Sequence, residues 1–161
     1  MINHAGKIMK QFKKLNTIIG WSVFLIATFV YLSTVEKTAS LWDCGEFISA
    51  AFKLEVVHEP GAPLFLMMGR IFTLFASDLT QVAVMVNSMS ALASSFTILF
   101  LFWTITAFGR KIYAKEGKIE TSKMFAILGA GIVGSLAYTF SDSFWFSAVE
   151  GEVYAMSSFF T

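Results

Sequence analysis

The sequence predicts an all-α polytopic membrane protein, and its composition and the placement of its charges are the observations that predict it. Hydrophobic residues make up 56% of the 161 positions and charged residues 14%, against usual shares of about 45–50% and roughly 25%. Long uncharged apolar runs alternate with short charged segments, as in proteins that cross a lipid bilayer several times. A disordered chain is excluded, because disorder needs low hydrophobicity and high charge. The net charge of +1 gives no overall field that attracts nucleic acid, so the bilayer and not nucleic acid is the expected partner.

Three apolar runs without charge are expected to span the membrane, at about residues 16–33, 82–108 and 124–140, because a helix of about 20 residues crosses a bilayer. A fourth span is expected to start at about residue 153. The first run follows four lysines, as the apolar centre of a cleaved signal peptide does. No small-x-small cleavage site follows it closely, so an uncleaved first span is favoured. Since the fourth run is still apolar at residue 161, we expect residues 1–161 to be the N-terminal part of one transmembrane domain.

The charges between the spans predict the orientation, because basic residues beside spans favour the cytoplasmic side. Four lysines precede the first span, and the 110–123 loop carries five Lys or Arg residues. The 34–81 segment has six acidic residues against three basic ones, and the 141–152 segment has three acids and no base. We therefore expect a multi-pass protein of the cell (inner) membrane with a cytoplasmic N-terminus and two acidic segments outside.

The outer loop 34–81 is expected to contain interfacial amphipathic helices. Residues 40–57 follow helical spacing, with Ser40 as a candidate cap and with Asp43 and Glu46 on one polar face. Four charged residues in this segment argue against a span, since each costs about 2.5–3.5 kcal/mol at the bilayer centre. A helix along the outer surface fits the pattern better.

A turn and a second short helix complete the outer loop. Pro and Gly residues at 58–63 predict a shaped turn. The following apolar run, 64–76, has 13 residues with Arg70 in its middle, which is short for a span and favours an interfacial or re-entrant helix.

Four side chains of the outer loop are candidates for one site: Asp43, Glu46, His58 and Arg70. Two carboxylates, an imidazole and a guanidinium at the outer surface suit general-base chemistry or phosphate binding. A purely structural interpretation stays open, in which Asp43 caps a helix and Arg70 extends to lipid headgroups.

The second outer segment, 141–154, combines aromatic and acidic residues. Three consecutive aromatic residues at 144–146 suit an interfacial belt, and Glu150 and Glu152 follow directly. A solvated loop and a functional acidic site beneath the belt are both open interpretations.

Two other signals do not carry chemistry. Residues 129–134 match the dinucleotide fingerprint G-x-G-x-x-G, but that motif must follow a strand. Here it lies in an uncharged apolar run, so small residues such as Gly131 and Ser135 are interpreted as close helix packing. The single cysteine, Cys44, excludes a disulfide within the chain.

Three ordered motifs, at residues 38–48, at 58–64 with 69–70, and at 143–145 with 148–155, make the chain resemble a known family of membrane proteins. The second motif is usually written H-P-P-G-x-P-L followed by G-R, and here Glu59 replaces its first proline. The family is known as DUF2723, is placed among the GT-C glycosyltransferases, and is similar to the protein O-mannosyltransferases.

This resemblance implies a GT-C-like start with three to four transmembrane helices and a membrane glycosyltransferase activity. Such an enzyme moves a sugar from a polyprenyl-phosphate donor to a protein or glycan hydroxyl on the outer face. It implies Asp43 as the catalytic carboxylate and Glu46 as the second choice, although the Asp-Glu pair of the O-mannosyltransferases is here separated by two residues. The motif residues implied in substrate binding are Trp42, His58, Arg70, Glu150, Glu152 and Tyr154.

The resemblance fixes no cofactor, and a divalent metal at Glu150 and Glu152 is left open. Because GT-C enzymes have many more spans, this chain is expected to hold the first part of the site and to be inactive alone. Two other classes stay open, a transporter or lipid flippase and a non-catalytic membrane scaffold. The spans carry no charge, which counts against an ion path.

Overall fold

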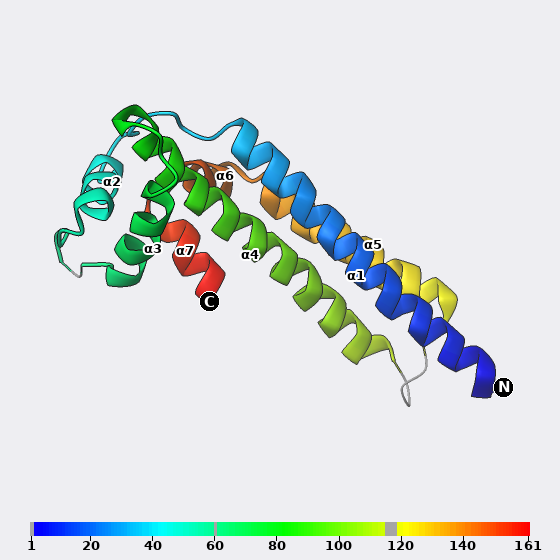
Figure 1. The fold of residues 1–161 in the computed structure, drawn as a ribbon. Coiled ribbons are helices and arrows are strands. Elements are labelled where there is room, and N and C mark those ends of the chain that lie inside the picture. The colour runs from blue at the N-terminus through cyan, green and yellow to red at the C-terminus, as the bar shows by residue number, and fades with distance from the viewer. Residues whose placement is uncertain (1, 60, 115–118) are drawn as a thin grey trace. The chain divides into compact units, whose positions relative to one another are not determined.

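The structure is a computed structural model that describes residues 2–59, 61–114 and 119–161. Pro60 of the predicted turn and Lys115 and Lys118 of the predicted cytoplasmic loop lie outside the described residues. Every regular element in the described ranges is a helix (Figure 1). In chain order these are α1 (Ile2–Ser33), α2 (Cys44–Lys53), α3 (Pro63–Thr73), the 3₁₀ helix η1 (Leu79–Gln81), α4 (Val82–Tyr113), α5 (Thr121–Thr139), α6 (Asp142–Val149) and α7 (Val153–Phe160).

Three of the described helices are long and apolar enough to cross a membrane: Gly6–Ser33, Leu79–Tyr113 and Thr121–Thr139. The protein is therefore an all-helical polytopic membrane protein, as predicted, with these helices over the three predicted runs. The α3 helix has 11 residues, too few to span. The α7 helix begins at Val153 as expected, and a fourth span starting there stays a prediction.

The described parts of residues 1–26 and 98–140 form one compact unit. In it α5 approaches α4 through small residues, because a Cβ atom on Gly131 would lie only 2.7 Å from Thr106 Cγ2 and 2.8 Å from Phe102. A Cβ atom on Gly134 would likewise lie 2.7 Å from Ile105 Cδ1. These contacts agree with the prediction that Gly131 and Gly134 serve helix packing, whereas Gly129 of the same motif has no neighbour within 4 Å.

The described parts of residues 27–97 and 141–161 form a second compact unit, which contains all the predicted site residues. Here α2 packs on α3, where Gly69 lies against Ala51 and the rings of Phe47 and Phe65 meet edge to face at 5.4 Å. The buried apolar cluster of this unit comprises Cys44, Phe47, Ile48, Ala50, Ala51, Val57, Phe65, Leu66, Val82, Val86, Met89 and Met156. The cluster anchors the short helices on the first turns of α4.

The helix predicted over residues 40–57 is shorter at both ends. It begins at Cys44, and Trp42 just before it has a left-handed backbone with φ 65°. Ser40 does not cap it: the Ser40 hydroxyl donates to the Glu150 carboxylate instead. At the other end Leu54 takes a left-handed conformation, φ 57°, which ends the helix.

Candidate active site

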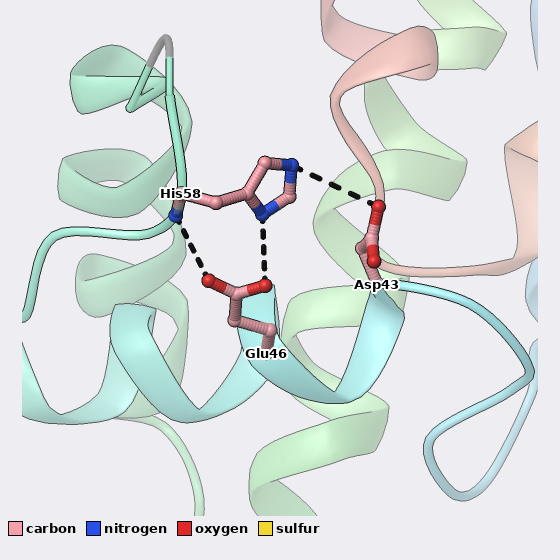
Figure 2. A network of polar contacts seen from close by, with 3 residues as sticks. All are labelled: Asp43, Glu46 and His58. Carbon is pink, nitrogen blue, oxygen red and sulfur yellow. Dashed lines mark hydrogen bonds and ion pairs between the residues drawn. The ribbon is translucent and has the colours of Figure 1, made fainter.

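Asp43, Glu46 and His58 come together at the start of α2 (Figure 2). The Glu46 carboxylate accepts the His58 backbone N–H through Oε1 at 2.9 Å and contacts His58 Nδ1 through Oε2 at 2.9 Å. His58 Nε2 faces Asp43 Oδ2 at 3.8 Å. Glu46 lies about one helical turn after Asp43, and the chain reverses after α2 so that His58 returns over both. The sequence prediction that these three converge is thus matched by the geometry.

The contacts of this cluster stabilise its charged forms. Hydrogen bonds from the backbone and ring of His58 lower the pKa of Glu46 below its ordinary value. The hydrogen bond to Glu46, followed by the charges of Glu46 and Asp43, raises the pKa of His58. Glu46 therefore holds the imidazole in place and favours the imidazolium. Asp43 is exposed and directed toward the free side of the ring.

Glu150 and Glu152 are buried at the turn between α6 and α7, with 3% and 7% of their surfaces exposed. The Glu152 N–H donates to the Glu150 carbonyl at 3.0 Å, so the turn is tight. Burial is the main cause that raises the pKa of each carboxyl, and the charges of Glu150 and Asp43 add to the effect at Glu152. The solvated-loop interpretation of residues 141–154 is therefore wrong, because these acids pack inside the second unit.

A pocket of about 350 Å³, here called the carboxylate pocket, joins the two acidic groups. Asp43 belongs both to the His58 cluster and to the wall of this pocket. The pocket is lined by Trp42, Asp43, Phe146, Ser147, Glu150, Glu152 and Tyr154. Five of the residues expected in catalysis or substrate binding thus share one cavity.

The three aromatic residues at 144–146 have different roles. Phe144 is buried and meets the Tyr31 ring at 6.3 Å, and Trp145 Nε1 donates to Thr34 Oγ1 at 3.2 Å. Phe146 is exposed and lines the carboxylate pocket. The run therefore ties α6 to the end of α1 and also supplies one aromatic wall.

Asn87 on α4 is the residue that sequence reasoning missed. Its side chain is fully buried, and its Nδ2 donates to the carbonyls of Glu36 at 2.7 Å and Thr38 at 3.1 Å. Its Oδ1 lies 4.0 Å from the Cys44 thiol. One amide thus holds the segment before α2 and contacts the first residue of that helix. The available signal was a lone amide in an otherwise uncharged apolar run.

Arg70 does not join the carboxylates. Its guanidinium donates to the Phe52 carbonyl at 2.7 Å near the end of α2, and it lies 5.4 Å from the centre of the Phe52 ring. The expectation that Arg70 converges with Asp43, Glu46 and His58 is therefore wrong in geometry. Phe52 lies in the last turn of α2, whereas Asp43 and Glu46 lie at its start. Arg70 therefore contacts the opposite end of the helix.

The His58 cluster also has the donors of a cation site. One ligand atom from each of Asp43, Glu46 and His58 lies within 4.8 Å of the others, and all three residues are exposed. Both Glu46 oxygens already contact His58, so the arrangement is complete as an ion-paired network. Its donors fit a metal only if the imidazole turns away from Glu46.

Comparison with known proteins places the chain in a family. Residues 43–161 match the model described as the protein O-mannosyl-transferase TMEM260 N-terminal domain. A Dictyostelium discoideum protein named protein O-mannosyl-transferase tmem260 is 27% identical over 139 residues, which is 86% of this chain and 15% of that protein. A Mus musculus protein named protein O-mannosyl-transferase TMEM260 is 29% identical over 140 residues, 86% of this chain and 17% of the relative. No solved structure matches.

Proposed function

The chain belongs to the protein O-mannosyl-transferase TMEM260 N-terminal domain family, and from this membership we propose that it carries the first part of the active site of a membrane glycosyltransferase. The chain spans under a fifth of the length of the two relatives. The proposed enzyme moves a sugar from a polyprenyl-phosphate donor to a hydroxyl of a protein acceptor at the outer face of the cell membrane. The relatives' names favour mannose as the sugar and a protein as the acceptor.

The observation that carries this proposal is the position of Asp43, between the ion-paired His58 cluster and the carboxylate pocket. In the proposed reaction the acceptor oxygen forms a bond to the anomeric carbon of the sugar while the bond from that carbon to the phosphate oxygen breaks. The phosphate leaves with the electron pair, and Asp43 takes the acceptor's proton as general base. Glu46 is the weaker candidate, because both of its oxygens already contact His58.

Glu46 and His58 have supporting roles in this proposal. Glu46 is a positioning residue that fixes the imidazole and raises its pKa. A protonated His58 offers positive charge beside Asp43, where it stabilises the charge that develops on the departing phosphate. Arg70 has no such role here, because its guanidinium binds the Phe52 carbonyl.

The test is sugar transfer in membranes that contain the full-length protein. A labelled polyprenyl-phosphate mannose is the donor, and Asp43→Asn is compared with the unchanged protein at matched expression. Loss of a general base typically lowers the rate by about 10²–10⁴-fold. Asp142→Asn is the matched control, since Asp142 is an exposed aspartate of α6 outside the pocket.

Each outcome decides one part of the proposal. Loss of transfer in Asp43→Asn alone supports Asp43 as the base. Transfer that persists in Asp43→Asn refutes that role and moves it to Glu46, Glu150 or Glu152. An unchanged protein that transfers no sugar from any polyprenyl-phosphate donor refutes the enzyme and favours the transporter or scaffold.

A further inference from the structure

The carboxylate pocket has a charge that opposes phosphate. Three of its lining residues are acids, Asp43, Glu150 and Glu152, and none of the lining residues the structure describes is Lys, Arg or His. Like charges within a few ångströms repel strongly where water is partly excluded. A lipid phosphate is therefore disfavoured inside this pocket, whereas neutral ligands are accepted.

Glu152 is the feature that indicates a ligand. Only 7% of this residue is exposed, it lines the pocket, and no hydrogen bond to its carboxylate is found among the described residues. Glu150 differs, because the Ser40 hydroxyl donates to it. The carboxylate oxygens of Glu152 open onto the pocket, and a largely desolvated carboxylate gains from any hydrogen-bond donor that enters. The pocket thus presents an acceptor that a ligand's hydroxyl groups can satisfy.

Aromatic faces stand beside these acceptors. The side chains of Trp42 and Tyr154 line the pocket and are 87% and 60% exposed. Such rings combine an apolar face with a polar edge, and so they suit a ligand that has C–H faces as well as hydroxyls. The volume of about 350 Å³ is at the small end of the roughly 300–1,000 Å³ of ligand pockets, which fits a single ring and not a lipid chain or a peptide.

We propose that the carboxylate pocket binds the neutral sugar ring of the donor, that Glu152 accepts hydrogen bonds from its hydroxyls, and that the donor phosphate is held outside the pocket. This inference rests on the proposed function for the choice of mannose. Asp43 at the wall of the pocket then faces the sugar, while the phosphate lies on the side of the His58 ring, which does not line the pocket.

The experiment measures binding and not transfer. Full-length protein in lipid nanodiscs is titrated with methyl α-mannoside and, separately, with a polyprenyl phosphate that carries no sugar. Glu152→Ala and Tyr154→Ala are compared with the Asp142→Asn control. We expect each pocket variant to bind methyl α-mannoside about tenfold more weakly or worse, because Glu152→Ala removes hydrogen bonds to a charged group and Tyr154→Ala removes an aromatic face. The affinity for polyprenyl phosphate should stay the same or rise in Glu152→Ala.

Several results would overturn the inference. Equal mannoside binding by Tyr154→Ala and the control would do so even if Glu152→Ala failed to fold, since Tyr154 is exposed. Loss of polyprenyl-phosphate binding in Glu152→Ala, with Tyr154→Ala folded and unaffected for mannoside, would identify a phosphate site. If mannoside binding required Mg²⁺ or Mn²⁺, a metal ion and not the Glu152 carboxylate would bind the sugar hydroxyls.

The experiments can refute the proposed enzyme activity and the proposed sugar subsite independently. If the pocket variants lose mannoside binding but the unchanged protein transfers no sugar, the sugar subsite stands and the enzyme is refuted. If the unchanged protein transfers mannose while mannoside binding is equal in all variants, the enzyme stands and the subsite is refuted.

Discussion

The side-chain amide of Asn87 donates a 2.7 Å hydrogen bond to the backbone carbonyl of Glu36, 51 positions earlier in the chain. Glu36 in turn donates its backbone N–H to the Val149 carbonyl at 3.0 Å, just before the buried acids. Asn87 therefore stands at the centre of a backbone network that connects the segment before α2 with the turn after α6. The candidate site is assembled on this network.

Asn87→Leu is expected to lower the stability of the protein. The substitution keeps the branched shape of the side chain but leaves the carbonyls of Glu36 and Thr38 without their donor, which costs about 1–3 kcal/mol. Thermal unfolding of the purified protein measures the loss. Ser95→Ala is the control in the same helix, because among the described residues the Ser95 hydroxyl bonds only to the carbonyl of Ala91 within α4. Equal melting temperatures for the two variants would contradict the proposed network.

Gly151→Ala is expected to disturb the turn that presents Glu150 and Glu152. A Cβ atom there would lie 2.8 Å from Asn87 Oδ1 and 3.1 Å from Val86, with Ile48 at 3.3 Å. These neighbours are themselves buried, so the turn must move and both sugar binding and stability should fall.

Gly129→Ala is the matched control for that substitution, since a Cβ on Gly129 meets nothing within 4 Å. Alanine is favoured over glycine in a helix by roughly 0.5–1 kcal/mol, so this variant should be as stable as the original or more so. Thermal unfolding and mannoside titration of both variants test the contrast. A Gly151→Ala protein that binds and melts like Gly129→Ala would refute the close approach at the turn.

The His58–Glu46 pair is expected to stabilise its turn most strongly at mildly acidic pH. The pKa of His58 is raised above 6.5, so its contribution is complete below 6.5 and is lost as pH rises through the folded value. The pKa of Glu46 is lowered below 4.5, so its contribution is complete above 4.5 and is lost as pH falls through the folded value. Together they give a window from about pH 4.5 to 6.5.

Amide hydrogen exchange of the His58 N–H, which donates to Glu46, reports this window. After correction for the intrinsic exchange rate, we expect the protection factor of this amide to decline as the pH rises above the window. In Glu46→Gln the imidazole pKa should fall toward its ordinary value and the dependence should flatten. A histidine titration that is the same in both proteins would show that the pair does not form.

Glu152→Gln is expected to raise the melting temperature at neutral pH. Burial raises the pKa of Glu152 above 4.5, so ionisation favours the unfolded chain and stability is lost as pH rises from 4.5 through the folded value. Glutamine removes that loss, and the gain should shrink toward zero below pH 4.5, where the carboxyl is neutral in both states. Melting temperatures of the two proteins across this pH range measure it. A difference that does not depend on pH would contradict the assigned burial of the charge.

The long helices could be predicted from the sequence because bilayer spans depend on local composition. Uncharged runs of 17 or more residues at 16–33, 82–108 and 124–140 need no knowledge of distant contacts. The meeting of Asp43, Glu46 and His58 was also accessible, since helical spacing and a nearby turn bring them together. The chemical role of these residues stays a prediction.

Other features depend on contacts between distant parts of the chain. Ser40 has the residue type of a helix cap, but its hydroxyl binds Glu150, 110 positions away. Glu152 is buried because Gly151 fits against Asn87, a contact that no local pattern contains. The sequence prediction for Arg70 is wrong for a related reason. Its polar partner is a backbone carbonyl of α2, and every residue has such a carbonyl, so no sequence pattern indicates it.

The single thiol of Cys44 gives this region a natural chemical reporter. Cys44 is the first residue of α2, it adjoins Asp43, and its side chain is fully buried against Asn87. A maleimide can alkylate the thiol only when the start of α2 separates from α4. The labelling rate therefore measures how often this local opening occurs. Methyl α-mannoside held in the carboxylate pocket should slow that labelling, and mass spectrometry of the Cys44 peptide would time the motion without any engineered probe.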